Sequence, residues 1–174
     1  MNVEILLSTY NGELYLEEQI ESLKKQIGVN ISILVRDDGS SDRTKEILEK
    51  YRKEGVLNWY AGENLKPAHS FFDLMKKASD SDFYAFCDQD DVWEEDKLLV
   101  AVENLKDLDS QIPALYFSRA QLVDSNLVEI KGVEYPDKVY SLGTALIRNN
   151  ATGCTMVFNR KLLECANKCT PSNV

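Results

Sequence analysis

The 174-residue sequence contains no apolar run of the 18 or more residues that a membrane-spanning helix needs. Residues 1–4 include no basic segment leading into an apolar stretch, so the sequence predicts no secretory signal. Basic side chains are in the minority, with 20 Lys and Arg against 29 Asp and Glu and a formal net charge of −9. Phosphate backbones are bound by clustered Lys and Arg. We therefore predict that the protein does not bind nucleic acid.

Several common catalytic and ligand-binding patterns are also missing. Histidine occurs once, as His69, and no spacing supports a Ser-His-Asp or Cys-His group. Neither G-x-G-x-x-G nor a P-loop occurs. Cys87 and Cys154 lie in apolar runs, as buried free thiols do. Cys165 and Cys169 have no nearby Cys or His to complete a zinc site, and the pattern favours a reducing compartment.

The composition that remains is that of one soluble globular domain, with 44% apolar and 28% charged residues. The charge is uneven, because residues 131–174 carry a net charge of +3 and residues 1–130 one of −12. A basic C-terminal segment favours an anionic membrane surface. Chance variation in a short segment explains the difference equally well.

Short apolar runs alternate with segments whose apolar residues have helical spacing. Predicted strands cover residues 3–7, 31–35, 56–60, 83–87, 114–118 and 155–158. Predicted helices cover residues 13–26, 42–53, 68–79, 94–107 and 160–168, with a short helix near 141–148. Two-sided apolar strands that alternate with helices are typical of an α/β domain with a mostly parallel central sheet flanked by helices.

Polar clusters follow three predicted strands, at residues 8–11, 37–40 and 88–91. Ligands of such sheets bind beyond the carboxyl ends of the strands. Because the three clusters follow those ends, we expect them to meet at one edge of the sheet and to form a single site.

The last cluster places the carboxylates of Asp88, Asp90 and Asp91 within four residues. Such carboxylates repel one another without a cation, and Mg²⁺ and Mn²⁺ prefer oxygen ligands that bridge to phosphates. Asp88 and Asp90 point the same way on an extended segment, while a turn would aim Asp91 into the site. The alternative is a solvated acidic turn that caps a helix near Glu94.

The other loops offer contacts typical of nucleotide sites. Asp38 ends a predicted strand, where a carboxylate accepts hydrogen bonds from a ribose hydroxyl or a base N–H. Gly39 allows a tight turn, and Asp42 is a helix-capping residue. Tyr10 offers a ring on which a base can stack. His69 lies near a helix start, which favours an anion such as a diphosphate, although a capping or exposed histidine is the alternative.

Residues 5–12, 35–44 and 87–93 together resemble family 2 glycosyltransferases of the GT-A fold in their order and spacing. The Asp-Gln-Asp-Asp-Val-Trp sequence in the last segment is similar to that of bacterial rhamnosyltransferase-like members, which build cell-surface polysaccharide. Residues 153–156 resemble the acceptor side of the site in that group. The resemblance implies a Rossmann-like nucleotide-sugar-binding domain over residues 1–174. It also implies inverting transfer of a sugar from a nucleotide diphosphate to an acceptor hydroxyl.

The resemblance also implies roles for individual residues, carried over by position. The nucleotide-binding residues are Ser8, Thr9, Tyr10, Asp37, Asp38 and Asp88. A Mn²⁺ or Mg²⁺ ion is held by Asp90, the main ligand, and by Asp88. The substrate-contacting residues are Asp91, His69, Gly153 and Cys154. The implied donor is a UDP- or dTDP-sugar and the acceptor a glycan or lipid-linked glycan, so we expect a cytoplasmic protein that works at the inner face of the membrane.

Two features depart from the family pattern. His69 stands where relatives often carry Asn. Inverting transfer also needs a general base, which the resemblance places after residues 153–156, where this sequence offers only Glu164 in a predicted helix. We therefore expect the base to lie beyond Val174 and the domain to be truncated at its C-terminus. The alternatives are a nucleotide-sugar-binding fragment or pseudoenzyme without the base, and a receiver-like phospho-acceptor domain.

Overall fold

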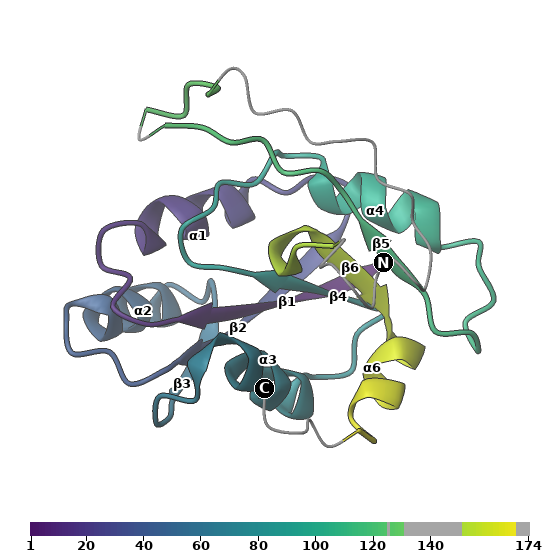
Figure 1. The fold of residues 1–174 in the computed structure, drawn as a ribbon, viewed down its shortest axis with the longest axis horizontal. Helices are drawn as coiled ribbons and strands as arrows, with labels where there is room; N and C mark the ends of the chain where they lie inside the picture. The colour runs from purple at the N-terminus through teal and green to yellow at the C-terminus, as the bar shows by residue number, and fades with distance from the viewer. Residues whose placement is uncertain (125, 131–150, 170–174) are drawn as a thin grey trace.

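The computed structural model describes residues 1–124, 126–130 and 151–169, and shows a central sheet with helices on both faces (Figure 1). The strands are β1 (Asn2–Thr9), β2 (Asn30–Asp37), β3 (Asn58–Ala61), β4 (Phe83–Cys87), β5 (Leu115–Phe117) and β6 (Met156–Asn159). The helices are α1 (Leu16–Lys24), α2 (Thr44–Lys53), α3 (Lys66–Lys77), α4 (Lys97–Leu105) and α6 (Arg160–Ala166). A 3₁₀ turn, Gly153–Thr155, precedes β6.

The order of the six strands is β3-β2-β1-β4-β6-β5, and the four strands from β3 to β4 run parallel. Strand β6 runs antiparallel to both β4 and β5. The expected α/β domain with a mostly parallel sheet is therefore confirmed. The register pairs Thr9 with Asp37 and Leu7 with Cys87, so β1, β2 and β4 end at the same edge.

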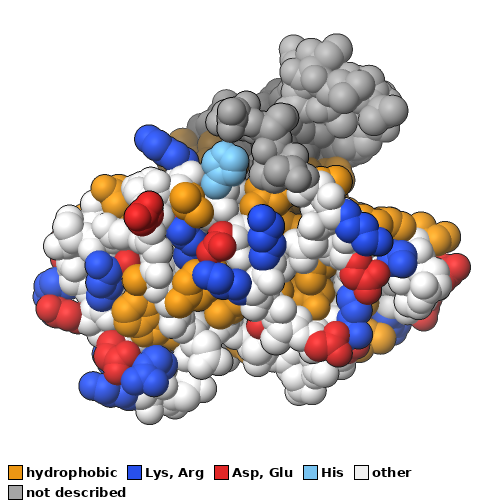
Figure 2. All heavy atoms as spheres, turned by 90° about the horizontal axis from the view of Figure 1, so that it is seen from below, with side chains coloured by type: hydrophobic (Ala, Val, Ile, Leu, Met, Phe, Trp, Pro, Cys, Tyr) orange, Lys and Arg blue, Asp and Glu red, His pale blue; other side chains and the backbone are white. Residues whose placement is uncertain are grey.

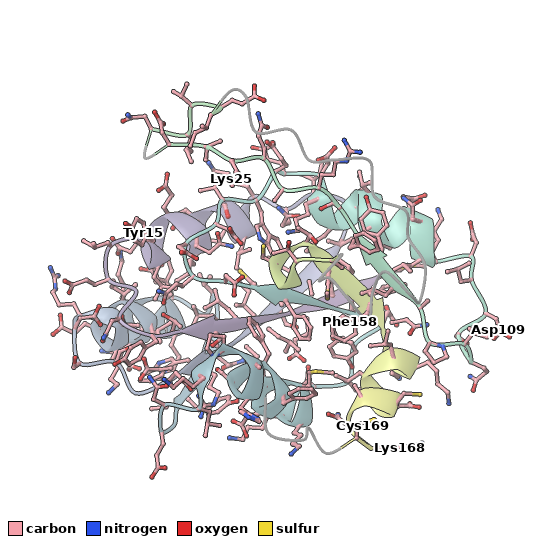
Figure 3. The ribbon with its side chains drawn as sticks, in the orientation of Figure 1. Tyr15, Lys25, Asp109, Phe158, Lys168 and Cys169 are labelled. Atoms are coloured by element: carbon pink, nitrogen blue, oxygen red, sulfur yellow. The ribbon has the colours of Figure 1, made fainter. Side chains whose placement is uncertain are left out.

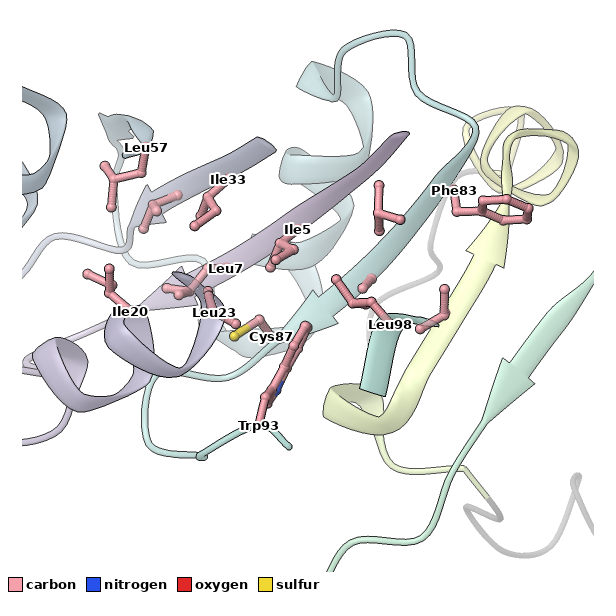
Figure 4. Packing of buried hydrophobic residues seen from close by; sticks show 14 of the residues in the cluster. Ile5, Leu7, Ile20, Leu23, Ile33, Leu57, Phe83, Cys87, Trp93 and Leu98 are labelled. Carbon is pink, nitrogen blue, oxygen red and sulfur yellow. The ribbon is translucent and has the colours of Figure 1, made fainter. Parts of the chain in front are cut away.

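Both faces of the sheet are covered, which explains why the central strands are apolar on both sides. Because successive strand residues point to opposite faces, Ile5 and Leu7 pack into a core cluster beneath α1, α2 and α4 (Figure 4). Leu6 points the other way and joins a second cluster with Leu74 of α3 and Leu163 of α6. Strand β1 is thus fixed from both sides, and the loop that follows it starts from a rigid position.

Several element boundaries differ from the sequence prediction for local reasons. Helix α1 begins at Leu16 rather than near residue 13, because the amides of Tyr15 and Leu16 both bond to the carbonyl of Gly12 in a turn. Helix α4 begins only at Lys97, since the acidic segment continues as a loop and turn before it. The predicted short helix near 141–148 lies outside the described residues.

Among the described residues, no helix is both long enough and apolar enough to cross a membrane. On the face that carries α3 and α6, basic and acidic side chains are interspersed (Figure 2). Lys77 is 3.2 Å from Asp73, and Arg160 is 2.8 Å from Asp80. The described part of this face therefore presents mixed charge rather than a continuous basic patch.

Candidate functional site

The loops after β1 and β4 are joined by one amide side chain, that of Gln89. Its Oε1 accepts hydrogen bonds from Thr9 Oγ1 at 2.6 Å and from the Tyr10 amide at 2.8 Å. Its Nε2 donates to the Tyr10 carbonyl at 3.2 Å. A Cβ on Gly12 would lie 2.5 Å from Gln89 Oε1, so any larger residue there would push the Gln89 side chain out of this position. The sequence alone assigns Gln89 no role, because nothing local distinguishes such an amide from a solvated one.

The loops after β1 and β2 are joined in the same way. Asn11 adopts a positive φ of 49°, which asparagine tolerates better than most residues. The side-chain Oδ1 of Asn11 accepts a hydrogen bond from the backbone N–H of Ser41 at 2.9 Å. The backbone N–H of Asn11 donates to Ser40 Oγ at 2.9 Å. The Gly12 amide donates to Thr44 Oγ1 at 2.8 Å. All three predicted polar loops therefore meet at one edge, as expected from their positions after the strands.

The three residues predicted to bind the nucleotide from the first loop differ in exposure. Ser8 is half-buried, with its Oγ 2.6 Å from Ser70 Oγ on α3. Thr9 is 1% exposed and is held by Gln89, whereas Tyr10 is 48% exposed. Of these side chains, Tyr10 is the one that the structure leaves open for stacking.

Asp37 has no exposed surface. Its carboxylate accepts the Ser40 amide at 3.2 Å and lies 3.7 Å from Lys45 Nζ. These contacts close the turn in which Gly39 adopts a φ of +88°, a conformation that glycine adopts without strain. Asp37 therefore shapes the loop, and in this structure it offers no open oxygen for the expected nucleotide contact.

Asp38 is 3% exposed and pairs with the guanidinium of Arg36. Its Oδ2 accepts the amides of Leu65 and Lys66 at 2.9 and 3.1 Å. Asp38 thus fastens the loop before α3 to the end of β2, and its carboxylate is enclosed rather than open to a ligand. Arg36, to which the sequence alone assigns no role, pairs with Asp38 and also contacts Asp73 and the Glu63 carbonyl.

The acidic turn, residues 88–91, brings Asp88 and Asp91 close to Cys154. The potential ligand atoms of these three residues lie within 4.8 Å of one another. Asp91 Oδ2 is buried and has no hydrogen-bond partner. Burial, reinforced by Asp91 and Asp90, raises the pKa of Asp88 to about 6. Uncompensated negative charge and a free buried oxygen fit a divalent cation. Asp90, the expected main ligand, is exposed on the same turn, and the structure brings Asp91 closer to Asp88.

A pocket of about 850 Å³ adjoins the acidic turn. Asp90, Asp91 and Cys154 line it, together with Lys97 and residues 118–124 that follow β5. This volume is in the range of ligand sites. None of the residues predicted to bind the nucleotide lines it. The acidic turn therefore contacts the loop after β1 through Gln89 and contributes Asp90 and Asp91 to the pocket.

Two predicted substrate residues, His69 and Gly153, are not among the residues that line this pocket. His69 is half-buried on the first turns of α3, behind the proline at the start of that helix. Gly153 begins the 3₁₀ turn, and a Cβ there would meet nothing within 4 Å. Of the four predicted substrate residues, the structure brings Asp91 and Cys154 together.

The four thiols are expected to differ sharply in reactivity. Cys87 is fully buried in the core (Figure 4), and burial raises its pKa well above the ordinary value. Burial and the neighbouring Asp91 raise the pKa of Cys154 to about 12. Because the thiolate is the reactive form, N-ethylmaleimide at pH 7.5 should first label the exposed Cys169, three residues beyond the last residue of α6 (Figure 3).

Peptide mass mapping over time measures this order. Full labelling in guanidinium chloride is the control that all four thiols are free. Modification of Cys87 in the folded protein as fast as that of Cys169 would contradict the described packing.

A family model described as Glycosyl transferase family 2 matches residues 4–166. The dTDP-rhamnosyl transferase RfbG of Shigella flexneri is 32% identical over 132 residues, which are 70% of this chain and 41% of that protein. The Escherichia coli protein WfgD, a UDP-Glc:alpha-D-GlcNAc-diphosphoundecaprenol beta-1,3-glucosyltransferase, is 30% identical over 93% of this chain and 62% of its own length.

Solved structures are similar in fold. Staphylococcus aureus TarS 1–349 in complex with UDP-GlcNAc superposes with a TM-score of 0.73 at 23% identity, over 98% of this chain and 49% of that one. The mannosyltransferase PcManGT of Pyrobaculum calidifontis, in complex with GDP-Man and Mn²⁺, superposes with a TM-score of 0.56 at 23% identity. The match covers 60% of this chain and 32% of that one. The predicted GT-A fold is confirmed. The chain spans between 41% and 62% of the length of these two curated relatives.

Proposed function

Because the chain belongs to glycosyl transferase family 2, we propose that it binds a nucleotide diphosphate sugar and a divalent cation and takes part in inverting transfer of the sugar to an acceptor hydroxyl. The observation that carries the proposal is the convergence of the three polar loops beside Asp88 and Asp91. The comparisons favour this function over a receiver-like phospho-acceptor domain.

The proposed donor is a UDP- or dTDP-sugar, and the product a bacterial cell-surface polysaccharide. RfbG is described as a dTDP-rhamnosyl transferase and WfgD as a glucosyltransferase that uses UDP-Glc, which supports both donor classes. Nucleotide sugars are made in the cytoplasm, where we place the protein. A lipid-linked acceptor would bring it to the inner membrane face.

We assign the nucleotide to the loops after β1 and β2. The exposed Tyr10 ring stacks on the base. Asp38 and Arg36 act by fixing the loop that borders this space, since their charged groups are enclosed. Thr9 and Gln89 hold the Tyr10 backbone in place.

Asp88, Asp90 and Asp91 would hold the divalent cation. When bound, Mn²⁺ or Mg²⁺ supplies Lewis-acid neutralisation of the diphosphate leaving group. The carboxylates of these residues bind and orient, and Asp91 lies where it borders both the cation site and the pocket. An acidic protein can bind an anionic donor in this way.

The pocket of about 850 Å³ is the proposed acceptor site. Tyr116 and Trp93 contribute aromatic surface to its lining, and aromatic faces suit sugar rings. We assign the general base to none of the described residues. Glu164, the acid noted above, is exposed on α6 and lies 3.4 Å from Lys161, outside the pocket lining. For this reason a donor-binding role without transfer is the second candidate.

Calorimetric titration of UDP, dTDP and GDP, each with and without Mn²⁺, tests the proposed donor site. We expect one nucleotide to bind, and to bind much more weakly without Mn²⁺. The matching monophosphate is the control, because it lacks the second phosphate that a cation bridges. Absence of binding by all three diphosphates, for protein that circular dichroism shows to be folded, would contradict the proposal.

A further inference from the structure

Lys97, the first residue of α4, is partly buried and lines the pocket beside the acidic turn. Its Nζ lies 3.8 Å from the ring centroid of Trp93, which is itself 5% exposed. The same Nζ donates a hydrogen bond to the carbonyl oxygen of Cys154 in the 3₁₀ turn. A cation held over an indole face and against a carbonyl has a fixed position.

The partners that fix this ammonium are neutral. The described residues include no ion pair between Lys97 and a carboxylate. Lys97 nonetheless lines the same pocket as Asp91 and Cys154, so its charge lies near the acidic turn. Because Lys97 is not bound to the carboxylate oxygens of that turn, it leaves them free for a metal ion.

Lys97 lowers the net negative charge around the proposed cation site. Asp88, Asp90 and Asp91 contribute three negative charges, and Lys97 contributes one positive charge. The net charge of these four side chains is therefore −2, which one divalent cation would neutralise. Without Lys97, three close carboxylates would face one another with less compensation.

We propose that Lys97 is a positioning residue of the donor site, which ties the 3₁₀ turn to α4 and offsets one carboxylate charge beside the cation. The inference rests on the proposed function. It has two separable consequences. The ammonium weakens binding of the bare cation, because like charges repel, and it holds Cys154 against the acidic turn.

Lys97→Met tests the charge, because methionine keeps an unbranched apolar chain over Trp93. We expect it to tighten Mn²⁺ binding about tenfold, since one unit charge is removed several ångströms from the cation. Electron paramagnetic resonance of free Mn²⁺ measures this without any substrate. A role limited to holding the 3₁₀ turn predicts no tightening of Mn²⁺ binding.

Three further variants complete the experiment. Lys97→Arg keeps the charge and should bind Mn²⁺ as the wild type does. Lys97→Gln removes the charge but keeps a donor for the Cys154 carbonyl, and serves if the methionine variant does not fold. Lys106→Met, just beyond the other end of α4, is the matched control for net charge and should have no effect.

The rate at which Cys154 is alkylated reports whether the 3₁₀ turn stays in place. We expect N-ethylmaleimide to label Cys154 faster in Lys97→Met than in the wild type, and Lys97→Gln to fall between them. Unchanged or weaker Mn²⁺ binding by folded neutral variants, with normal binding by the wild type, would overturn the role of Lys97 alone. Absence of Mn²⁺ binding by the wild type would overturn the proposed metal site as well.

Discussion

Asp88→Asn is expected to abolish metal-dependent nucleotide binding while raising the melting temperature of the metal-free protein. Asp88 belongs to the cation site predicted from the sequence and also to the cluster that the structure brings together with Asp91. Loss of even an outer-shell partner typically weakens metal binding about 10–100-fold, and loss of a ligand should cost at least that. Calorimetry of Mn²⁺ and of the preferred nucleotide measures the effect.

Asp88→Asn should stabilise the metal-free protein although it weakens metal binding. The reason is that ionisation of Asp88 in the folded protein costs free energy. Burial and neighbouring carboxylates raise its pKa from 3.8 to about 6 in the folded protein. Below the unfolded pKa the carboxyl is protonated in both states, so there is no penalty. The penalty grows as pH rises from 3.8 towards 6 and is complete above that.

We therefore expect Asp88→Asn to raise the free energy of unfolding of the metal-free protein by about 1 kcal/mol at pH 7 in EDTA, after allowance for solvent screening. That corresponds to about 2–4 °C in melting temperature for a chain of this size. At pH 4 the gain should largely disappear. Asp107→Asn, an exposed change just beyond the far end of α4, is the control and should alter neither property. Retained metal-dependent binding by Asp88→Asn would remove Asp88 from the site.

Arg36→Met is expected to destabilise the folded protein strongly. Arg36 is 2% exposed, pairs with Asp38 and lies 3.0 Å from Asp73. Its guanidinium also donates to the Glu63 carbonyl at 2.9 Å. Removal of one partner of a buried ion pair typically costs about 3–5 kcal/mol, because the other charge is left uncompensated.

Thermal unfolding of Arg36→Met should show a melting temperature about 10 °C lower, from about 2–4 °C per kcal/mol. Nucleotide binding should weaken with or without Mn²⁺, because Asp38 no longer holds the amides of Leu65 and Lys66 in place. Adding Asp38→Asn should restore part of the stability, since it removes the stranded charge. If the second change instead lowers stability further, the ion pair is not the source of the effect.

The sequence predicted the positions of the strands better than their partners. Strand β4 occupies the predicted residues 83–87, because a run of apolar residues bounded by polar ones is a local signal. The antiparallel direction of β6 left no such signal, since strand direction depends on how the chain returns to the sheet. The thiols of Cys87 and Cys154 are buried as predicted from their apolar surroundings.

The polar residues of the site were harder to assign. Sequence placed Asp37 and Asp38 at the end of a strand, and the structure encloses both. Side-chain direction at a strand end depends on the loops that fold over it, here the segment before α3. Gln89 and Arg36 were passed over for the same reason, because their partners are far away in the chain.

The sequence by itself determined the α/β alternation, the three polar loops after β1, β2 and β4, and the carboxylates that suit a cation. These follow from local composition and periodicity. The tertiary structure alone decided which carboxylate lies beside Asp88, which aspartates are enclosed, and that the ammonium of Lys97 lies next to Cys154. The reason is physical: burial and hydrogen bonding join residues brought together by packing, and packing between distant segments is not encoded at either segment alone.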